Sequence, residues 1–131
     1  MHGSIRTSSC LDCGEVVPFD EVVRLLPVPP CPRCGRVLKP DVVMFGELLP
    51  EDAIEQATRL AGEAGLLLVV GSSLEVYPVA GLPLETLGTG GRLAIVNRGS
   101  TELDDRADVR IDAGAGETLR ALAALLPGRP E

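Results

Sequence analysis

The sequence predicts an α/β protein made of two unlike parts, a small four-cysteine module followed by a parallel sheet with helices. The first 40 residues hold all four cysteines and six of the eleven prolines, which is typical of a module organised around a site rather than a hydrophobic core. After residue 40, short apolar runs alternate with segments of helical spacing, as in a layered sheet. Charge divides at the same place, because residues 1–40 carry five basic and four acidic side chains and residues 41–131 carry seven and fifteen. We therefore expect domains at residues 1–40 and 41–131.

The elements after residue 40 follow in order. Residues 41–45 form a short extended run. Pro50 and the two acidic residues after it are typical of the first turn of a helix, which Gly62 and Gly65 end. Residues 66–70 show no polar alternation, so we expect a central parallel strand covered on both faces.

The remaining chain continues the alternation. A short helix over residues 78–87 leads to a second strand at residues 92–96, and residues 108–111 give a third. Pro127 ends a last helix. The apolar stripe of that helix is Leu119, Leu122, Ala123 and Leu126.

Composition excludes several classes of function. The chain has 131 residues, 45% of them apolar, which suffices for a folded domain. Its formal net charge of −7 argues against binding to nucleic acid or to an anionic membrane through overall charge. The apolar run at residues 66–70 is far shorter than the roughly 20 residues that span a bilayer. The opening residues lack the basic and then apolar lead of a signal peptide, so we expect a soluble, cytoplasmic protein.

The cysteines are the strongest local signal. They form two C-x-x-C pairs separated by 17 residues, the spacing of a four-cysteine zinc ribbon. Four thiolates fill a tetrahedral shell and leave no position for water, so the expected Zn²⁺ is structural. The alternative is two disulfides, which a reducing cytoplasm disfavours. The predicted ligands are Cys10, Cys13, Cys31 and Cys34.

Small and polar residues follow each of the three predicted strands. These exits are residues 71–73, residues 97–100 and residues 113–116. Ligands of parallel sheets bind outside the carboxyl ends of the strands, so the three exits together predict a nucleotide-binding rim. The alternative is ordinary turn chemistry. A complete G-x-G-x-x-G is absent, because Leu119 stands where its last glycine would be.

His2 is the single histidine and the one side chain whose ordinary pKa suits proton transfer near neutrality. A histidine directly after the first methionine is more often part of a chain end that has no role, so the position by itself does not indicate a function.

Taken in order, six motifs resemble those of the sirtuin family of NAD-dependent protein-lysine deacylases, over nearly the whole chain. They are His2-Gly3-Ser4, the C-x-x-C pairs, Lys39-Pro40-Asp41-Val42-Val43-Met44-Phe45-Gly46-Glu47, Gly71-Ser72-Ser73-Leu74, Val76-Tyr77-Pro78 and Ile95-Val96-Asn97. The resemblance implies that residues 41–131 are the carboxyl half of a Rossmann-like NAD-binding domain and that residues 1–40 are the family's zinc module.

The resemblance also implies roles for single residues. His2 would be the general base on the nicotinamide ribose. The acyl oxygen would attack the ribose as nicotinamide leaves, and the histidine would then promote attack by the neighbouring ribose hydroxyl on the resulting intermediate. The products would be free lysine, nicotinamide and O-acyl-ADP-ribose. NAD⁺, the co-substrate, would contact Gly71, Ser72, Ser73, Asn97 and Ala115. The acyl-lysine peptide would be clamped as an added strand. Its expected contacts are Val43, Phe45, Gly46, Glu47, Leu74 and Val76.

The chain departs from the family pattern in two ways. Ala113 stands where the family commonly has glycine in its turn near the adenine. The Gly-Ala-Gly loop and the Gln-Asn-x-Asp segment, which precede the His-Gly motif in sirtuins, do not occur. Three hypotheses follow: the carboxyl half of a deacylase, an inactive zinc-stabilised peptide-binding module, or a subunit completed by a separate amino-terminal chain. A half-sheet would expose an apolar edge, which predicts self-association or instability.

Overall fold

The computed structural model describes residues 1–126. The chain divides into two compact units, Met1–Ile54 and Glu55–Glu131. The first carries the cysteines and the second the parallel sheet. The predicted boundary at residue 40 falls inside a strand, and the extent of each domain stays a prediction.

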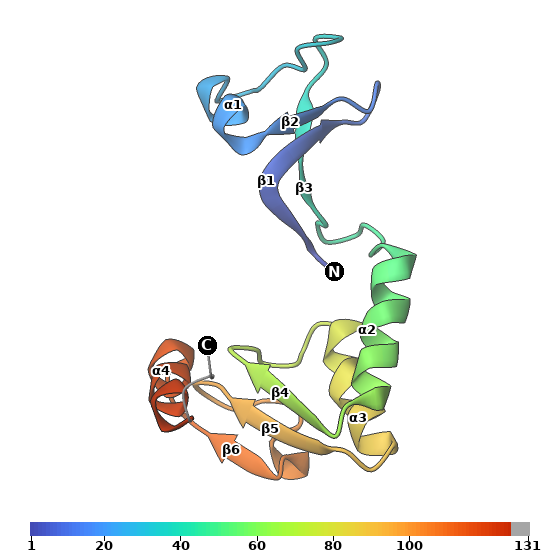
Figure 1. Ribbon diagram of the computed structural model, residues 1–131. Coiled ribbons are helices and arrows are strands. Elements are labelled where there is room, and N and C mark those ends of the chain that lie inside the picture. Colours follow the sequence, from blue (N-terminus) through green and yellow to red (C-terminus); the bar gives the residue numbers. More distant parts are fainter. Residues whose placement is uncertain (127–131) are drawn as a thin grey trace. The chain divides into compact units, whose positions relative to one another are not determined.

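The first unit is a three-stranded antiparallel sheet. Its strands are β1 (Gly3–Cys10), β2 (Val16–Pro18) and β3 (Leu38–Val42), in the order β2-β1-β3. Figure 1 shows β1 as a long curved strand between the other two, and the pairing of β1 with β3 shifts register between Gly3 and Ser8. The short helix α1 (Phe19–Arg24) follows β2 directly. The small core consists of Cys10, Val17, Val22, Cys31 and Leu38.

The extended run predicted at residues 41–45 is only partly a strand. β3 ends at Val42, because its partner β1 begins at Gly3. One more bond continues the ladder, from the Val43 N–H to the His2 carbonyl at 3.0 Å. The chain then leaves the sheet, so residues 43–45 lie beyond the strand, and a turn follows from Met44 to Glu47.

The second unit holds a parallel sheet. Its strands β4 (Leu66–Val70), β5 (Arg92–Val96) and β6 (Val109–Ile111) run in the order β4-β5-β6, and their arrowheads point the same way in Figure 1. Helix α3 (Leu82–Gly88) contacts β4 and β5. The remaining elements are α2 (Glu51–Glu63), which begins in the first unit, the 3-10 turns η1 (Val79–Gly81) and η2 (Asp104–Arg106), and α4 (Ala115–Leu125).

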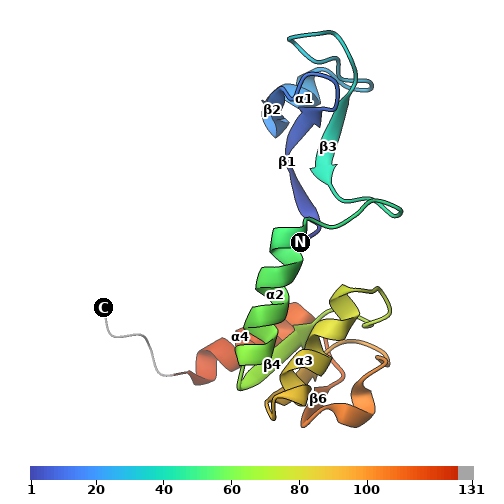
Figure 2. The same cartoon turned by 90° about the vertical axis from the view of Figure 1, so that its right-hand side faces the viewer.

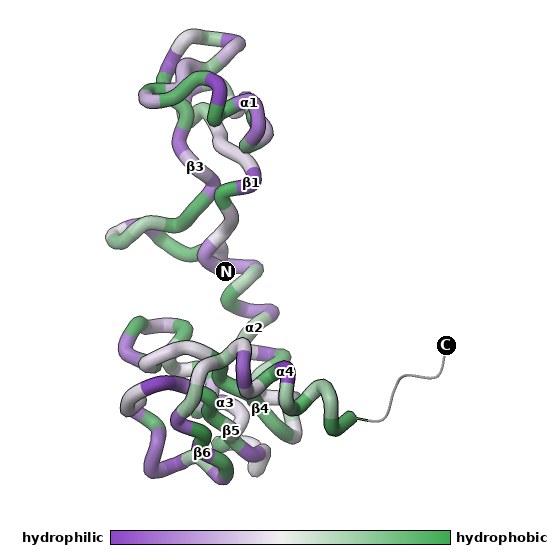
Figure 3. The backbone as a smooth tube through the Cα atoms, turned by 90° about the vertical axis from the view of Figure 1, so that its left-hand side faces the viewer, coloured by the Kyte–Doolittle hydropathy of each residue, from purple (hydrophilic) through white to green (hydrophobic). Residues whose placement is uncertain are grey.

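The core of this unit is centred on β5. Leu93 and Ile95 are fully buried, together with side chains from β4 and the connecting segments. The buried Thr86 hydroxyl donates a hydrogen bond of 2.6 Å to the Ala61 carbonyl and so joins α3 to α2. Figure 3 shows apolar stretches along β4 and β5, and also along α4. Burial of β5 on both sides therefore holds the unit together.

The sequence prediction that residues 66–70 form the central strand is wrong for the sheet that the structure describes. β4 pairs only with β5, and within residues 1–126 its other edge has no strand. Leu66 is 60% exposed and Leu68 44%. The continuous apolar run at residues 66–70 predicted a covered strand, but in this structure it forms an exposed edge of the sheet. No helix among the described residues is long and apolar enough to cross a membrane.

Candidate functional site

The two C-x-x-C pairs fold as matching loops. In the first, the Gly14 N–H donates to the Cys10 carbonyl at 2.9 Å, and in the second the Gly35 N–H donates to the Cys31 carbonyl at 2.8 Å. Each loop directs both of its thiols to the same point, and all four Sγ atoms lie within 4.8 Å of one another. The Sγ atoms of Cys10 and Cys34 are 3.4 Å apart.

This cluster fits a zinc ion. Four sulfurs at about 2.3 Å from a tetrahedral zinc lie about 3.8 Å from one another, which matches the cluster. All four cysteines are free rather than paired in disulfides. The N–H groups of Cys13 and Asp12 donate toward the Cys10 sulfur and lower the pKa of that thiol from 9.0 to about 7. Backbone donors thus favour the thiolate form of Cys10, the form that binds a metal.

His2 and the segment after β3 meet at the open end of the first unit's sheet. His2 is exposed, and its carbonyl accepts the Val43 N–H. A Cβ at Gly3 would lie 2.0 Å from the Asp41 carbonyl oxygen, so a larger residue would push the strands apart. Glycine after His2 therefore lets β1 and β3 approach closely, and the predicted catalytic histidine lies beside the predicted peptide-binding segment.

Lys39 holds that segment in a network that the sequence did not reveal. Its Nζ donates to the carbonyl of Val42 at 2.8 Å and lies 3.0 Å from Oε2 of Glu47. The same Glu47 oxygen accepts the N–H of Met44 at 2.9 Å. The Met44 N–H and the Lys39 ammonium group together lower the pKa of Glu47. Glu47, predicted to contact peptide, has its carboxylate engaged within the loop.

The three strand exits of the second unit lie side by side, as predicted. The Gly71 N–H donates to the Val96 carbonyl at 2.9 Å, and the Asn97 N–H donates to the Ile111 carbonyl at 3.1 Å. Each bond extends the parallel ladder one residue beyond its strand. Ala115 begins α4 shortly after β6. The predicted NAD⁺-binding residues therefore share one edge of the sheet, while their role stays a prediction.

Leu74 differs from its predicted setting. It follows the Gly71-Ser72-Ser73 turn with a φ of 60°, and its side chain is only 5% exposed. It packs in the core formed with β4 and β5. Only its backbone can therefore contact a peptide, whereas the neighbouring Val76 is 51% exposed. The Ser72 hydroxyl accepts the Leu74 N–H at 3.2 Å and fixes the turn.

Arg110 and Arg98 also shape the rim, and the sequence did not single them out. The Arg110 guanidinium donates to the Asn97 carbonyl at 2.9 Å and is held by Oδ1 of Asp104 at 2.8 Å. The pKa of Asp104 is lowered, mainly by the hydrogen bond from the Thr101 hydroxyl and further by the Arg110 guanidinium. The Arg98 side chain lies against Gly114, where a Cβ would be 2.9 Å from a guanidinium nitrogen. No motif marks these contacts, because they join residues that only the sheet brings together.

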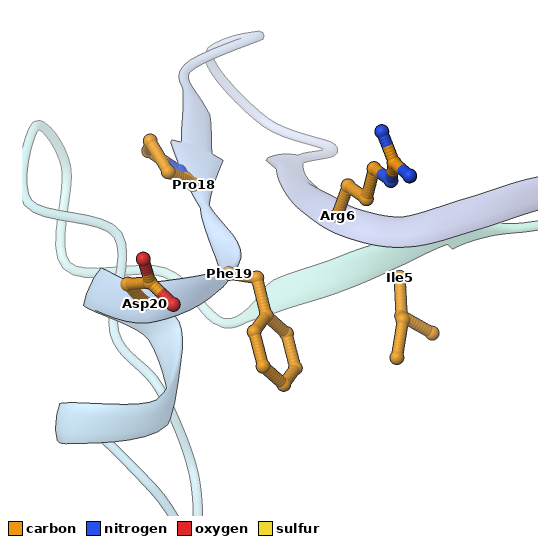
Figure 4. A pocket seen from close by; sticks show the side chains of 5 residues that line it. All are labelled: Ile5, Arg6, Pro18, Phe19 and Asp20. Atoms are coloured by element: carbon orange, nitrogen blue, oxygen red, sulfur yellow. The ribbon is translucent and has the colours of Figure 1, made fainter.

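A hollow of about 490 Å³ lies on the first unit, and it shares no residue with the predicted site. Figure 4 shows Ile5 and Phe19 pointing to the same side, with Arg6 directed away from them. The lining residues are Ile5, Arg6, Pro18, Phe19 and Asp20.

Comparisons with known proteins agree with one another. The model of the Sir2 family matches residues 1–78. The "NAD-dependent protein deacetylase 1" of Geobacillus kaustophilus is 49% identical over 123 residues, which make up 93% of this chain and 50% of that protein. The "NAD-dependent protein deacylase" of Thermus thermophilus is 43% identical over 131 residues, or 100% of this chain and 50% of that protein.

Solved structures give the same result. One described as "Sir2-p53 peptide-NAD+" has a TM-score of 0.89 and 38% identity, covering 95% of this chain and 53% of that chain. Another, "Structure of Sir2Tm bound to a propionylated peptide", also has a TM-score of 0.89 and 38% identity, covering 95% and 54%. The chain thus spans about half the length of the relatives that it matches. With the family's model matched over more than half of its residues and the shared fold, this chain belongs to the Sir2 family.

Proposed function

We propose that the chain is the carboxyl half of an NAD-dependent protein-lysine deacylase and supplies its zinc module, its general base and one rim of its NAD⁺ site. The observation that carries this proposal is the fold, which matches at a TM-score of 0.89 a relative described with both peptide and NAD⁺. The relatives named as deacetylases or deacylases are about twice as long, so activity of this chain depends on what the other half supplies.

His2 would act as the general base. NAD⁺ would supply the ribose carbon that the acyl oxygen attacks and the nicotinamide that leaves. His2 would accept a proton from a ribose hydroxyl at its imidazole, which is exposed. The hydroxyl so activated would attack the acyl carbon, and hydrolysis by one water molecule would release free lysine and O-acyl-ADP-ribose.

The peptide would add as a strand beside the segment that follows β3. Within residues 1–126 the N–H groups of Phe45 and Gly46 donate no hydrogen bond, which leaves them available to an extended peptide. Phe45 is 95% exposed, so its ring is free to contact a bound peptide. Val43, Gly46, Glu47, Leu74 and Val76 would complete the peptide-binding residues.

Two groups would bind the other components. Gly71, Ser72, Ser73, Asn97 and Ala115 would contact NAD⁺ at the carboxyl edge of the sheet, where loop amides converge. Zn²⁺ bound by the four cysteines would be structural, because its shell would hold no water. Free cysteines are consistent with the cytoplasm, where thiols stay reduced, and we place the protein there.

A second candidate function is a peptide-binding fragment or subunit without activity of its own. The exposed edge of β4 favours it, because an edge with Leu66 and Leu68 uncovered invites an amino-terminal half or a second copy of the chain. Sedimentation velocity of the chain alone distinguishes these two occupants. The chain sediments as an oligomer if a second copy covers the edge, and as a monomer if an amino-terminal half covers it.

The direct test is nicotinamide release from NAD⁺ in the presence of an acetyl-lysine peptide. The chain is assayed alone and after co-expression with the amino-terminal half of the Thermus thermophilus relative. We expect release only in the second case, and its loss in His2→Ala but not in Arg59→Met, which removes an exposed charge of α2. Release that His2→Ala leaves intact would contradict the role of His2, and no release in either case would favour the binding module.

A further inference from the structure

The segment between Val42 and Glu47 is held by a set of polar contacts that neither β-pairing nor burial explains. It lies beyond the end of β3, and its large apolar side chains, Met44 and Phe45, are exposed. Figure 3 shows the loop after β3 extending from the sheet with much of its length apolar. A loop of this kind has no hydrophobic core to fix its backbone, so other contacts must do so.

The backbone of the loop closes in a single turn. The Glu47 N–H donates to the Met44 carbonyl at 3.0 Å, and Gly46 has a φ of 89°. A glycine with positive φ at the third position is what a type II turn requires. The Glu47 carboxylate returns to the Met44 N–H at 2.9 Å, so the turn is closed from both directions.

Lys39 joins this turn to the strand before it. Its Nζ reaches the Pro40 carbonyl at 3.3 Å, the Val42 carbonyl at 2.8 Å and Glu47 Oε2 at 3.0 Å. The ammonium group has three donors, and these three acceptors use all of them. The Lys39 side chain is 29% exposed and that of Glu47 41%, so the pair is only partly screened by water. One side chain thus connects both ends of the loop.

We propose that Lys39 is a positioning residue for the acyl-lysine peptide: it holds residues 42–47 in the bound geometry before the peptide arrives. This inference rests on the proposed function of that segment as one wall of the peptide site. Lys39 would not touch the peptide; it acts through Glu47 and the Val42 carbonyl. A loop that is already ordered loses less conformational entropy on binding, which raises affinity without adding a contact.

The experiment compares variants of the full chain by two measurements. Lys39→Met keeps most of the apolar stem and removes the ammonium group, whereas Lys39→Arg keeps a cation. Arg59→Met is the matched control, because it removes the cation of an exposed ion pair in α2. The measurements are amide hydrogen exchange at Met44 and Glu47, and the affinity for a fluorescent acetyl-lysine peptide.

We expect Lys39→Met to speed exchange at both amides and to weaken peptide affinity roughly tenfold, which corresponds to about 1.4 kcal/mol. Lys39→Arg should recover most of the affinity, and Arg59→Met should change neither measurement. Zinc content and the unfolding midpoint should be unchanged, which separates positioning from general destabilisation.

Two results would overturn the proposal. Unchanged exchange in Lys39→Met would show that the loop is ordered without the lysine. Faster exchange with unchanged affinity would show that the order of the loop does not matter for the peptide. In either case binding by the wild-type chain leaves the proposed function intact. If the wild-type chain does not bind the peptide, the proposed function fails for this chain and the positioning role fails with it.

Discussion

The two units of the chain are stabilised by different means. The unit Met1–Ile54 has five buried core residues, two of which are cysteines, around strands as short as three residues. The unit that follows has a core of aliphatic side chains centred on Leu93 and Ile95. A small core cannot balance the entropy of the chain, so the first unit depends on its metal, whereas the second depends on burial. The two units should therefore fail under different treatments.

Removal of zinc should have the largest effect and should be confined to the first unit. Binding of zinc to small modules contributes on the order of 10 kcal/mol to their folding. We expect chelation, or Cys31→Ser, to unfold β1, β2 and β3 while β4, β5 and β6 remain. Amide chemical shifts of the two units and zinc content measure this. A first unit that keeps its dispersed shifts without metal would contradict the comparison.

Leu93→Ala should have the next largest effect and act on the second unit. Leu93 is fully buried in β5, and such truncations cost about 2–5 kcal/mol. Zinc content should be unchanged. Leu66→Ala, at an exposed position of β4, is the control and should change stability by about 0.5 kcal/mol or less. Denaturant unfolding followed by the amides of β5 measures both, and equal effects would contradict the central position of β5.

Thr86→Val should destabilise the second unit by about 1–3 kcal/mol. The substitution keeps the shape of the side chain but leaves the Ala61 carbonyl without its 2.6 Å hydrogen bond in a buried position. Thr89→Val removes an exposed hydroxyl in the same helix region and should cost less. Thermal unfolding of the two variants measures the difference, and a Thr86→Val variant as stable as wild type would show that the contact between α2 and α3 is dispensable.

Acid should give the smallest and most specific effect. The folded pKa of Asp104 is lowered from 3.8, first by the Thr101 hydroxyl, so its contribution is present above the unfolded value and is lost as pH falls through the folded one. Thr101→Ala should bring the pKa of Asp104 back toward 3.8, as measured by carboxyl carbon shifts during titration. An unchanged Asp104 pKa in Thr101→Ala would show that Arg110 dominates instead.

Several features were predictable from local sequence. The strand at residues 92–96 matches β5, and the helix after Pro50 matches α2, because apolar spacing and first-turn residues act within the segment itself. The cysteine spacing predicted a cluster that the structure shows. The burial of the Leu74 side chain was not predictable, since a turn residue gives no sign that its side chain returns to the core.

The sequence by itself determined the class of fold, the four thiols that lie together and the alignment of the strand exits, because each follows from spacing along the chain. Only the tertiary structure decided that β4 has an open edge, that Lys39 joins both ends of the loop at residues 42–47, and that Arg110 holds the Asn97 carbonyl. Strand order depends on which distant segments pair, and the contacts of Lys39 and Arg110 depend on how the backbone turns back after a strand ends. Spacing along the chain encodes neither.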